Sequence, residues 1–198
     1  MTATTPHTTL ANTLWPSDAK SNNWLRFVIL AFAGSILMAL ASKIQIPFYP
    51  VPMTMSTFVL LGLSMAYGWK LAGATFALYL AEGALGLPVF AGTPEKGIGL
   101  AYMMGGTGGY LIGYVLAAVT VGWLGDKGWD RNPLTTFGAM LIGSAVIYIP
   151  GLLWLGVLFG WDKPLLEWGL TPFILGDLTK IALASAVLPI AWKFLKRN

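Results

Sequence analysis

The chain has 198 residues, of which 12 are Lys or Arg, 8 are Asp or Glu, and 56% are hydrophobic. Soluble domains carry about 25% charged residues, so a charged fraction of 10% excludes an ordinary soluble domain. The net charge of +4 does not indicate nucleic-acid binding, because basic residues in so apolar a chain more often set membrane orientation. The absence of cysteine excludes disulfides, thiol catalysis and thiolate metal sites.

The polar N-terminal segment differs from the rest of the chain. Residues 1–23 contain six threonines and no apolar stretch of signal-peptide length, so we predict a disordered cytoplasmic tail. Residues 24–198 are predicted to form a six-helix integral membrane domain.

Six apolar runs indicate the membrane-spanning segments. They are residues 25–46, 54–68, 70–90, 106–124, 134–159 and 172–193. A helix of about 20 apolar residues crosses the hydrocarbon core, and lipid offers no partner to an unpaired backbone group, so these runs must be helical. The predicted fold class is an all-α membrane protein with six transmembrane helices.

Lysine and arginine are distributed unevenly between the two ends of these helices. The end that carries the N-terminus has Lys20, Arg26, Lys70, Lys127, Arg131, Lys193, Lys196 and Arg197, and the other end has Lys43, Lys96 and Lys163. By the positive-inside rule, this asymmetry places both the N- and the C-terminus in the cytoplasm.

Three charged residues, Glu82, Asp177 and Lys180, lie inside apolar runs. A charge at mid-membrane costs at least about 2.5–3.5 kcal/mol, so each should face protein or a water-filled cavity. Counting along the helices puts all three in the outer half of the membrane, which predicts an outward-facing pocket near the outer surface. Two alternatives stay open: an Asp177–Lys180 pair that only fixes helix packing, and a protonated Glu82 that bonds a neighbouring helix.

Two connections on the outer side have an unusual composition. Residues 46–54 contain three prolines among apolar and aromatic residues, which indicates a stiff non-helical loop that could wall the pocket. Residues 105–109 contain four glycines just before the fourth run. Backbone amides at a helix start suit a carboxylate, but Gly105, Gly109 and Gly113 also have the spacing of close helix packing.

Small residues recur every four positions on the first helix, at Ala31, Ser35 and Ala39. Such a stripe permits the close approach of another helix, either within the bundle or in a partner subunit.

The chain lacks the motifs of the common catalytic classes. It has no G-x-x-x-x-G-K-[ST] loop for ATP phosphates, and its single histidine, His7, lies in the tail. Zinc chemistry and a histidine-activated nucleophile are therefore disfavoured. We expect a binding protein with no catalytic residue, no metal, no cofactor and no nucleic-acid partner.

Four segments resemble the BioY family: residues 50–54, 78–92, 105–113 and 176–180. BioY proteins are the biotin-binding substrate-specificity components (S components) of energy-coupling factor (ECF) transporters. The resemblance implies a multi-pass S component of the bacterial cytoplasmic (inner) membrane that captures biotin at the outer face with high affinity. It further implies delivery inward with an ECF transmembrane coupling subunit and an ATPase pair. Ser56 and Gly106 depart from the residues that many relatives have, Gln and Pro, which affects the loop contacts more than the ligand.

The resemblance favours Asp177 and Lys180 as partners of the ureido group of biotin, and Glu82 is added as a second acceptor on chemical grounds. We expect the carboxylate of biotin near the backbone amides at the start of the fourth run. The residues expected to meet the carboxylate are Thr107, Gly108 and Tyr110. The apolar residues expected around the ring and chain of biotin are Val51, Met53, Tyr79 and Phe90.

The family also uses small residues of the first helix to contact the coupling subunit, a role that Ala31, Ser35 and Ala39 match in kind. Two other functions remain open at this point. One is a solitary ion-coupled vitamin transporter in which Glu82 or Asp177 titrates. The other is a non-transporting membrane assembly protein.

Overall fold

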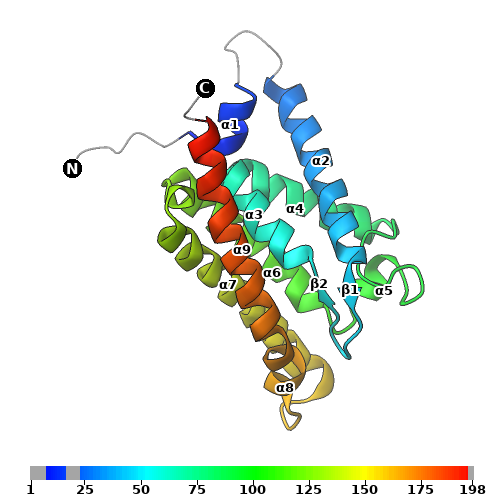
Figure 1. The fold of residues 1–198 in the computed structure, drawn as a ribbon. Coiled ribbons are helices and arrows are strands. Elements are labelled where there is room, and N and C mark those ends of the chain that lie inside the picture. Colours follow the sequence, from blue (N-terminus) through cyan, green and yellow to red (C-terminus); the bar gives the residue numbers. More distant parts are fainter. Residues whose placement is uncertain (1–7, 17–22, 196–198) are drawn as a thin grey trace, which may run out of the picture.

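The computed structural model describes residues 8–16 and 23–195 of the chain (Figure 1). The elements in chain order are α1 (Leu10–Leu14), α2 (Asn23–Lys43), β1 (Gln45–Ile46), β2 (Met53–Thr54), α3 (Ser56–Tyr67), α4 (Trp69–Ala84), α5 (Gly99–Met103), α6 (Gly108–Asp126), the 3-10 helix η1 (Trp129–Arg131), α7 (Pro133–Phe159), α8 (Leu165–Gly169) and α9 (Thr171–Leu195).

Each predicted apolar run overlaps one of the longer helices, α2, α3, α4, α6, α7 and α9. Helices α2, α6 and α7 and the segment from α8 through α9 are long and apolar enough to cross a membrane. Helix α3 has only 12 residues and α4 has 16. The prediction of a mostly helical multi-pass membrane protein is therefore confirmed in its general form.

Helix α6 lies at the centre of the bundle, where it packs against α3, α4 and α7 (Figure 1). Buried residues make up 61% of its most apolar stretch, against 33% for α2 and for α7. Helix α2 packs on α4, and α9 packs on α7 and α3. The apolar side chains that α2, α7 and α9 leave exposed suit a lipid environment, since lipid is as apolar as they are.

Two glycines of α6 allow the close contact between α6 and α7. A Cβ atom at Gly109 would lie 2.3 Å from the carbonyl oxygen of Pro150, and one at Gly113 would lie 2.8 Å from that of Ile147. Gly105 does not share this role, because a Cβ there would meet only the carbonyl of Tyr102, at 3.1 Å. The packing interpretation thus holds for two of the three glycines.

The proline-rich segment 46–54 is non-helical, as predicted, but its ends form a small sheet. Gln45 pairs with Thr54 and Ile46 with Met53 in an antiparallel hairpin. The fold is therefore not purely helical. The hairpin joins α2 to α3 and holds the prolines at one end of the bundle (Figure 1).

The predicted disorder of residues 1–23 is wrong for residues 8–16. Thr9 caps α1 by accepting a hydrogen bond from the amide of Asn12 (3.3 Å), and Leu10 is buried against the core. The guanidinium of Arg26 donates to the carbonyl of Ala11 at 2.9 Å. The composition of the segment did not predict this short helix. A capping hydrogen bond and one buried leucine stabilise it, and the leucine is buried only when the segment packs against the rest of the chain. Residues 1–7, 17–22 and 196–198, with Lys20, Lys196 and Arg197, lie outside the described part of the chain.

The third predicted run, residues 70–90, does not form one helix. Helix α4 ends at Ala84, and Gly86 has a φ of 96° that suits glycine in the turn that follows. The segment from Leu85 to Ile98 then folds back over the end of the bundle and leads into the short helix α5. Phe90 and Ala91 of this loop are buried, whereas Leu85 and Leu87 are exposed. Hydropathy joined the loop to the membrane run because it does not distinguish these two situations.

The α6–α7 contact gives a stability prediction. Gly109→Ala should lower the unfolding free energy by about 1–3 kcal/mol, because the added methyl group must displace the backbone of α7. Thermal unfolding in detergent measures the effect. Gly138→Ala on α7 is the matched control, because a Cβ there meets nothing within 4 Å and alanine favours helix. Equal melting temperatures for the two variants would contradict the prediction.

Candidate functional site

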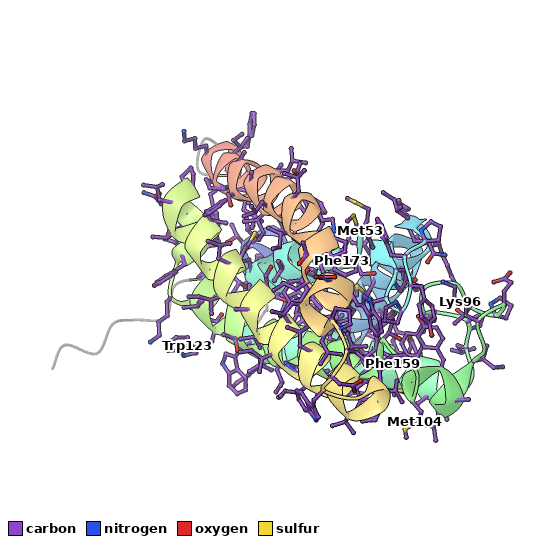
Figure 2. All side chains as sticks on the ribbon, turned by 90° about the horizontal axis from the view of Figure 1, so that it is seen from below. Met53, Lys96, Met104, Trp123, Phe159 and Phe173 are labelled. Atoms are coloured by element: carbon purple, nitrogen blue, oxygen red, sulfur yellow. The ribbon has the colours of Figure 1, made fainter. Side chains whose placement is uncertain are left out.

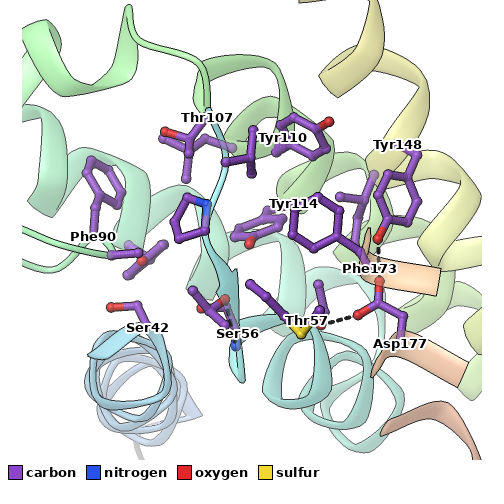
Figure 3. A pocket seen from close by; sticks show the side chains of 18 of the residues that line it. Ser42, Ser56, Thr57, Phe90, Thr107, Tyr110, Tyr114, Tyr148, Phe173 and Asp177 are labelled. Atoms are coloured by element: carbon purple, nitrogen blue, oxygen red, sulfur yellow. Dashed lines mark hydrogen bonds between the residues drawn. The ribbon is translucent and has the colours of Figure 1, made fainter. Parts of the chain in front are cut away.

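A cavity of about 620 Å³, including its opening (Figure 3), lies beside the hairpin, at the end of the bundle away from α1 (Figure 1). Its walls come from the hairpin, the loop after α4, and helices α2 to α7 and α9. The lining residues are Ser42, Val51, Pro52, Met53, Thr54, Ser56, Thr57, Tyr79, Phe90, Ala91, Tyr102, Thr107, Tyr110, Leu111, Tyr114, Ile147, Tyr148, Phe173, Asp177 and Lys180.

The hairpin and the start of α9 meet on one side of this cavity. Figure 2, which views the molecule from below, shows Met53 and Phe173 close together, with Lys96 far out on the loop that precedes α5. A Cβ atom at Gly176 would lie 3.0 Å from the sulfur of Met53. The proline-rich segment therefore forms a wall of the cavity against α9, as the sequence predicted.

Asp177 and Lys180 form a buried ion pair on α9. The ammonium nitrogen of Lys180 lies 2.9 Å from Oδ1 of Asp177, and the side chains are 11% (Lys180) and 8% (Asp177) exposed. The same ammonium donates to the carbonyl of Thr54 at 2.8 Å and to the hydroxyl of Thr57 at 3.0 Å. Its three N–H groups therefore have three acceptors, as a buried ammonium requires.

The carboxylate of Asp177 is also held from more than one helix. The hydroxyl of Thr57 on α3 donates to Oδ1 at 3.1 Å, and the hydroxyl of Tyr148 on α7 donates to Oδ2 at 2.5 Å (Figure 3). Hydrogen bonds to a charged oxygen are stronger than those between neutral groups. The four side chains form one polar cluster, called the α9 cluster below: Asp177, Lys180, Thr57 and Tyr148.

Aromatic side chains form the opposite wall. The ring of Phe90 packs edge-on against Tyr79, with centroids 5.3 Å apart, and stacks on Tyr102 at 5.1 Å. The hydroxyl of Tyr79 donates to the carbonyl of Val89 (3.0 Å), and that of Tyr102 donates to the carbonyl of Ala91 (2.8 Å). These hydrogen bonds fix the two tyrosine rings to the loop. The wall therefore presents apolar ring surface to the cavity, while the tyrosine hydroxyls are bonded to the loop backbone.

Helix α2 anchors the same loop. The ammonium of Lys43 donates to the carbonyls of Phe90 and Thr93, both at 2.9 Å, and the hydroxyl of Ser42 donates to the carbonyl of Val89 at 2.6 Å. Buried carbonyl groups need such partners. The position of Phe90 in the cavity therefore depends on α2 as well as on α4.

The start of α6 contributes Thr107, Tyr110 and Tyr114 to the cavity. Tyr110 is held by a hydrogen bond from its hydroxyl to the carbonyl of Gly169 (2.8 Å). Gly108, predicted to contact ligand, does not line the cavity. A Cβ atom there would overlap the carbonyl of Met103, and its amide already donates to Gly105 at 3.0 Å. This environment favours close packing as the role of Gly108 over contact with ligand.

Glu82 does not line the cavity either. It lies in the last turns of α4, where α2 packs, and its Oε1 accepts a hydrogen bond from the hydroxyl of Ser35 at 3.0 Å. The structure gives the expected second ureido acceptor no support, because Glu82 bonds Ser35 and is not among the residues that line the cavity. Its position along the chain did not determine which way its side chain faces on α4.

The small-residue stripe of α2 faces the interior. Ala31 is 6% and Ser35 is 0% exposed, and Ala39 packs against the core. Helix α4 of the same chain packs on α2, which favours the alternative that the stripe serves packing within the bundle over contact with a partner subunit. The side of α2 that is left exposed carries larger residues, among them Phe32, Ile36 and Leu40.

Eight of the predicted ligand-contacting residues do line the cavity: Val51, Met53, Tyr79, Phe90, Thr107, Tyr110, Asp177 and Lys180. Sequence reasoning missed Thr57, Tyr102, Tyr114 and Tyr148. Tyr148 gave a usable signal, because it lies within an apolar run and its hydroxyl needs a partner there. In the described part of the chain, no three His, Cys, Asp or Glu residues come together as a metal site.

Comparison with known proteins gives concordant matches. The model of the BioY family matches residues 11–197 of the chain. The chain is 36% identical to the "Probable biotin transporter BioY" of Pyrococcus horikoshii over 148 residues, which are 75% of this chain and 85% of the relative. It is 31% identical to the "Biotin transporter BioY" of Thermotoga maritima over 163 residues, 82% of this chain and 94% of the relative.

A solved structure has the same fold. The S-component for biotin from an ECF-type ABC transporter, a crystal structure, superposes with a TM-score of 0.72 at 24% sequence identity. The match covers 88% of this chain and 95% of that one.

The ion pair gives a prediction for the ligand-free protein. Lys180→Met should lower the unfolding free energy by about 3–5 kcal/mol, because it leaves the Asp177 carboxylate buried without a cation. The double variant Asp177→Asn/Lys180→Met should be more stable than Lys180→Met alone. Unfolding in detergent measures all three as a double-mutant cycle.

An exposed pair supplies the control for this cycle. Lys163 and Asp162 are 3.0 Å apart but 47% and 73% exposed, so Lys163→Met should cost less than about 1 kcal/mol. Additive losses from Asp177→Asn and Lys180→Met would show that the two charges are not coupled.

Proposed function

The chain belongs to the BioY family, and from this and the cavity we infer that it is the biotin-binding S component of an ECF transporter. Its relatives are transporters rather than enzymes. The observation that carries the proposal is the α9 cluster, which presents hydrogen-bond donors and an acceptor side by side on the wall of the cavity.

The ureido group of biotin complements this cluster. It has two N–H donors next to one carbonyl acceptor. The carboxylate of Asp177 can accept an N–H group, while Lys180 or the hydroxyl of Tyr148 can donate to the carbonyl. Because Asp177 is charged, its hydrogen bonds to ligand would be of the stronger, charge-assisted kind.

The other parts of biotin find matching surroundings in the cavity. The sulfur-containing ring and the alkyl chain would lie against Tyr79, Phe90 and Met53, since these side chains remove apolar surface from water. The carboxylate would lie near the start of α6. There the hydroxyl of Thr107 would meet it, with the helix dipole favouring negative charge.

We place both termini in the cytoplasm and the cavity toward the outer surface, with six membrane helices in residues 24–198 and a cytoplasmic N-terminal segment 1–23. The described basic residues near α1 support this orientation: Arg26 and Arg131 donate to the backbone of Ala11 and Thr8. The cavity lies at the opposite end, so biotin would be captured outside. Delivery to the inside would need an ECF coupling subunit and an ATPase pair, since the chain has no phosphate-binding loop of its own.

Substitution in the α9 cluster tests the ligand site. Asp177→Asn and Lys180→Met should each lower biotin affinity more than tenfold, which is over about 1.4 kcal/mol, because each leaves a buried partner unpaired. Isothermal titration of purified protein measures this. Glu82→Gln is the control and should change the affinity by less than about twofold, because Glu82 bonds Ser35 outside the cavity. Unchanged affinity in both cluster variants would refute the site.

Reconstituted uptake tests the transport mechanism. Proteoliposomes that contain this chain with a coupling subunit and ATPases should take up biotin only when ATP is supplied. Proteoliposomes with this chain alone should bind biotin without accumulating it. Accumulation by the chain alone that stops when the proton gradient is collapsed would instead support the solitary ion-coupled transporter.

A further inference from the structure

A second concave surface lies at the opposite end of the molecule from the biotin cavity. It is a groove of about 860 Å³, open on one side, between the first turns of α7 and the last turns of α9. None of the residues that line it lines the biotin cavity. The proposed function therefore leaves this surface without a role.

The floor of the groove is apolar and made by small side chains. Ala182, Ala186 and Ile190 follow each other every four residues and so share one face of α9. From α7, Leu134 and Phe137 form the facing wall, and Leu134 is 82% exposed. Because the alanines are short, the helices leave a channel between them instead of a packed contact.

Two cations close one end of this channel, Arg131 and Lys193. Both lie where α9 ends and η1 leads into α7. No acidic side chain is among the described residues that line the groove. The nearby Asp130 is 1% exposed and accepts the indole N–H of Trp192 at 2.6 Å, so it is not part of the groove surface.

The guanidinium of Arg131 is held in place by its neighbours but does not use all of its N–H donors. It lies over the ring of Trp192, 4.7 Å from the centroid, and one Nη2 donates to the carbonyl of Thr8 at 3.3 Å. Its Nε is buried and has no hydrogen-bond acceptor among the described residues. A planar guanidinium fixed in this way is suited to bind a phosphate through two of its N–H groups.

We propose that this groove binds one anionic phospholipid, with an acyl chain along Ala182, Ala186 and Ile190 and the phosphate bound by Arg131 and Lys193. The combination of an apolar channel with two cations at its end matches an amphiphile with a negative head. A transmembrane helix of a partner would fill the channel but would provide no negative group for the two cations. The groove lies at the same end of the molecule as Arg26 and Lys70. Anionic lipid head groups attract basic residues at a membrane surface, so the position of the groove suits an anionic phospholipid.

The proposal is tested by native mass spectrometry of the detergent-solubilised chain titrated with phosphatidylglycerol or with phosphatidylcholine of the same acyl chains. The unaltered protein should retain one phosphatidylglycerol at a concentration at least tenfold lower than phosphatidylcholine requires. Arg131→Gln/Lys193→Gln should abolish this preference. The matched control Lys70→Gln/Lys127→Gln removes the same charge near the same end, outside the groove, and should keep the preference.

A second variant tests the apolar part. Ala186→Trp should fill the channel and weaken phosphatidylglycerol binding at least fivefold while both cations remain. Arg131→Lys/Lys193→Arg keeps both charges and should restore most of the preference, which separates a charge effect from misfolding. Biotin titration of each variant reports on the fold, and it should be unchanged because no groove residue lines the biotin cavity.

Three results would overturn the proposal. The first is equal retention of the two lipids by the unaltered protein. The second is retention of phosphatidylglycerol by the groove double variant at the level of its charge-matched control. The third comes from the assembled transporter: since the chain has no cysteine, Ala186→Cys gives a single thiol, and its cross-linking to the coupling subunit would identify the groove as a protein interface. Absence of biotin binding by the unaltered protein, with its preference for phosphatidylglycerol intact, would count against the proposed function alone.

Discussion

Lys180 carries a charge inside an apolar helix. The acceptors that compensate this charge come from several segments, and they bring those segments together around the cavity. Its ammonium is bonded to Asp177 on α9, to Thr57 on α3 and to the carbonyl of Thr54 on β2. Tyr148 adds α7 through the carboxylate. An unpaired charge in such surroundings would be far more costly than the ordering of these groups. One cation thereby holds two helices and the hairpin around a common space.

The remaining wall depends on backbone carbonyls instead of charges. The loop after α4 places Phe90 in the cavity, and its carbonyl groups are bonded by Lys43, Ser42 and Tyr79. Close glycine contacts keep α6 against α7, so larger side chains of α6 such as Tyr110 can point to the cavity. Tight packing at one level of the bundle is thus what leaves room for a ligand at another.

The two concave surfaces differ in how they present charge, and this decides which ligand suits each. In the cavity lined by Asp177 and Lys180, cation and anion neutralise one another and offer both donors and an acceptor, which suits a neutral, polar group such as the proposed ureido group. In the groove between α7 and α9, Arg131 and Lys193 lie together with no acid among the described residues of the groove surface, which suits an anion attached to an apolar chain.

Much of the architecture is determined by the sequence itself. Runs of apolar residues must become helices in lipid, and Asp177 and Lys180, three apart in such a run, had to share a face and find partners. What the sequence could not determine is which way the remaining side chains face, because that depends on helix rotation and on contacts between distant segments. Glu82 bonds Ser35 and does not line the cavity, the stripe at Ala31 meets α4, and Gly108 packs against Met103. Thr57 and Tyr148 became part of the site only through tertiary packing, since nothing local to either residue specifies its distance to Asp177.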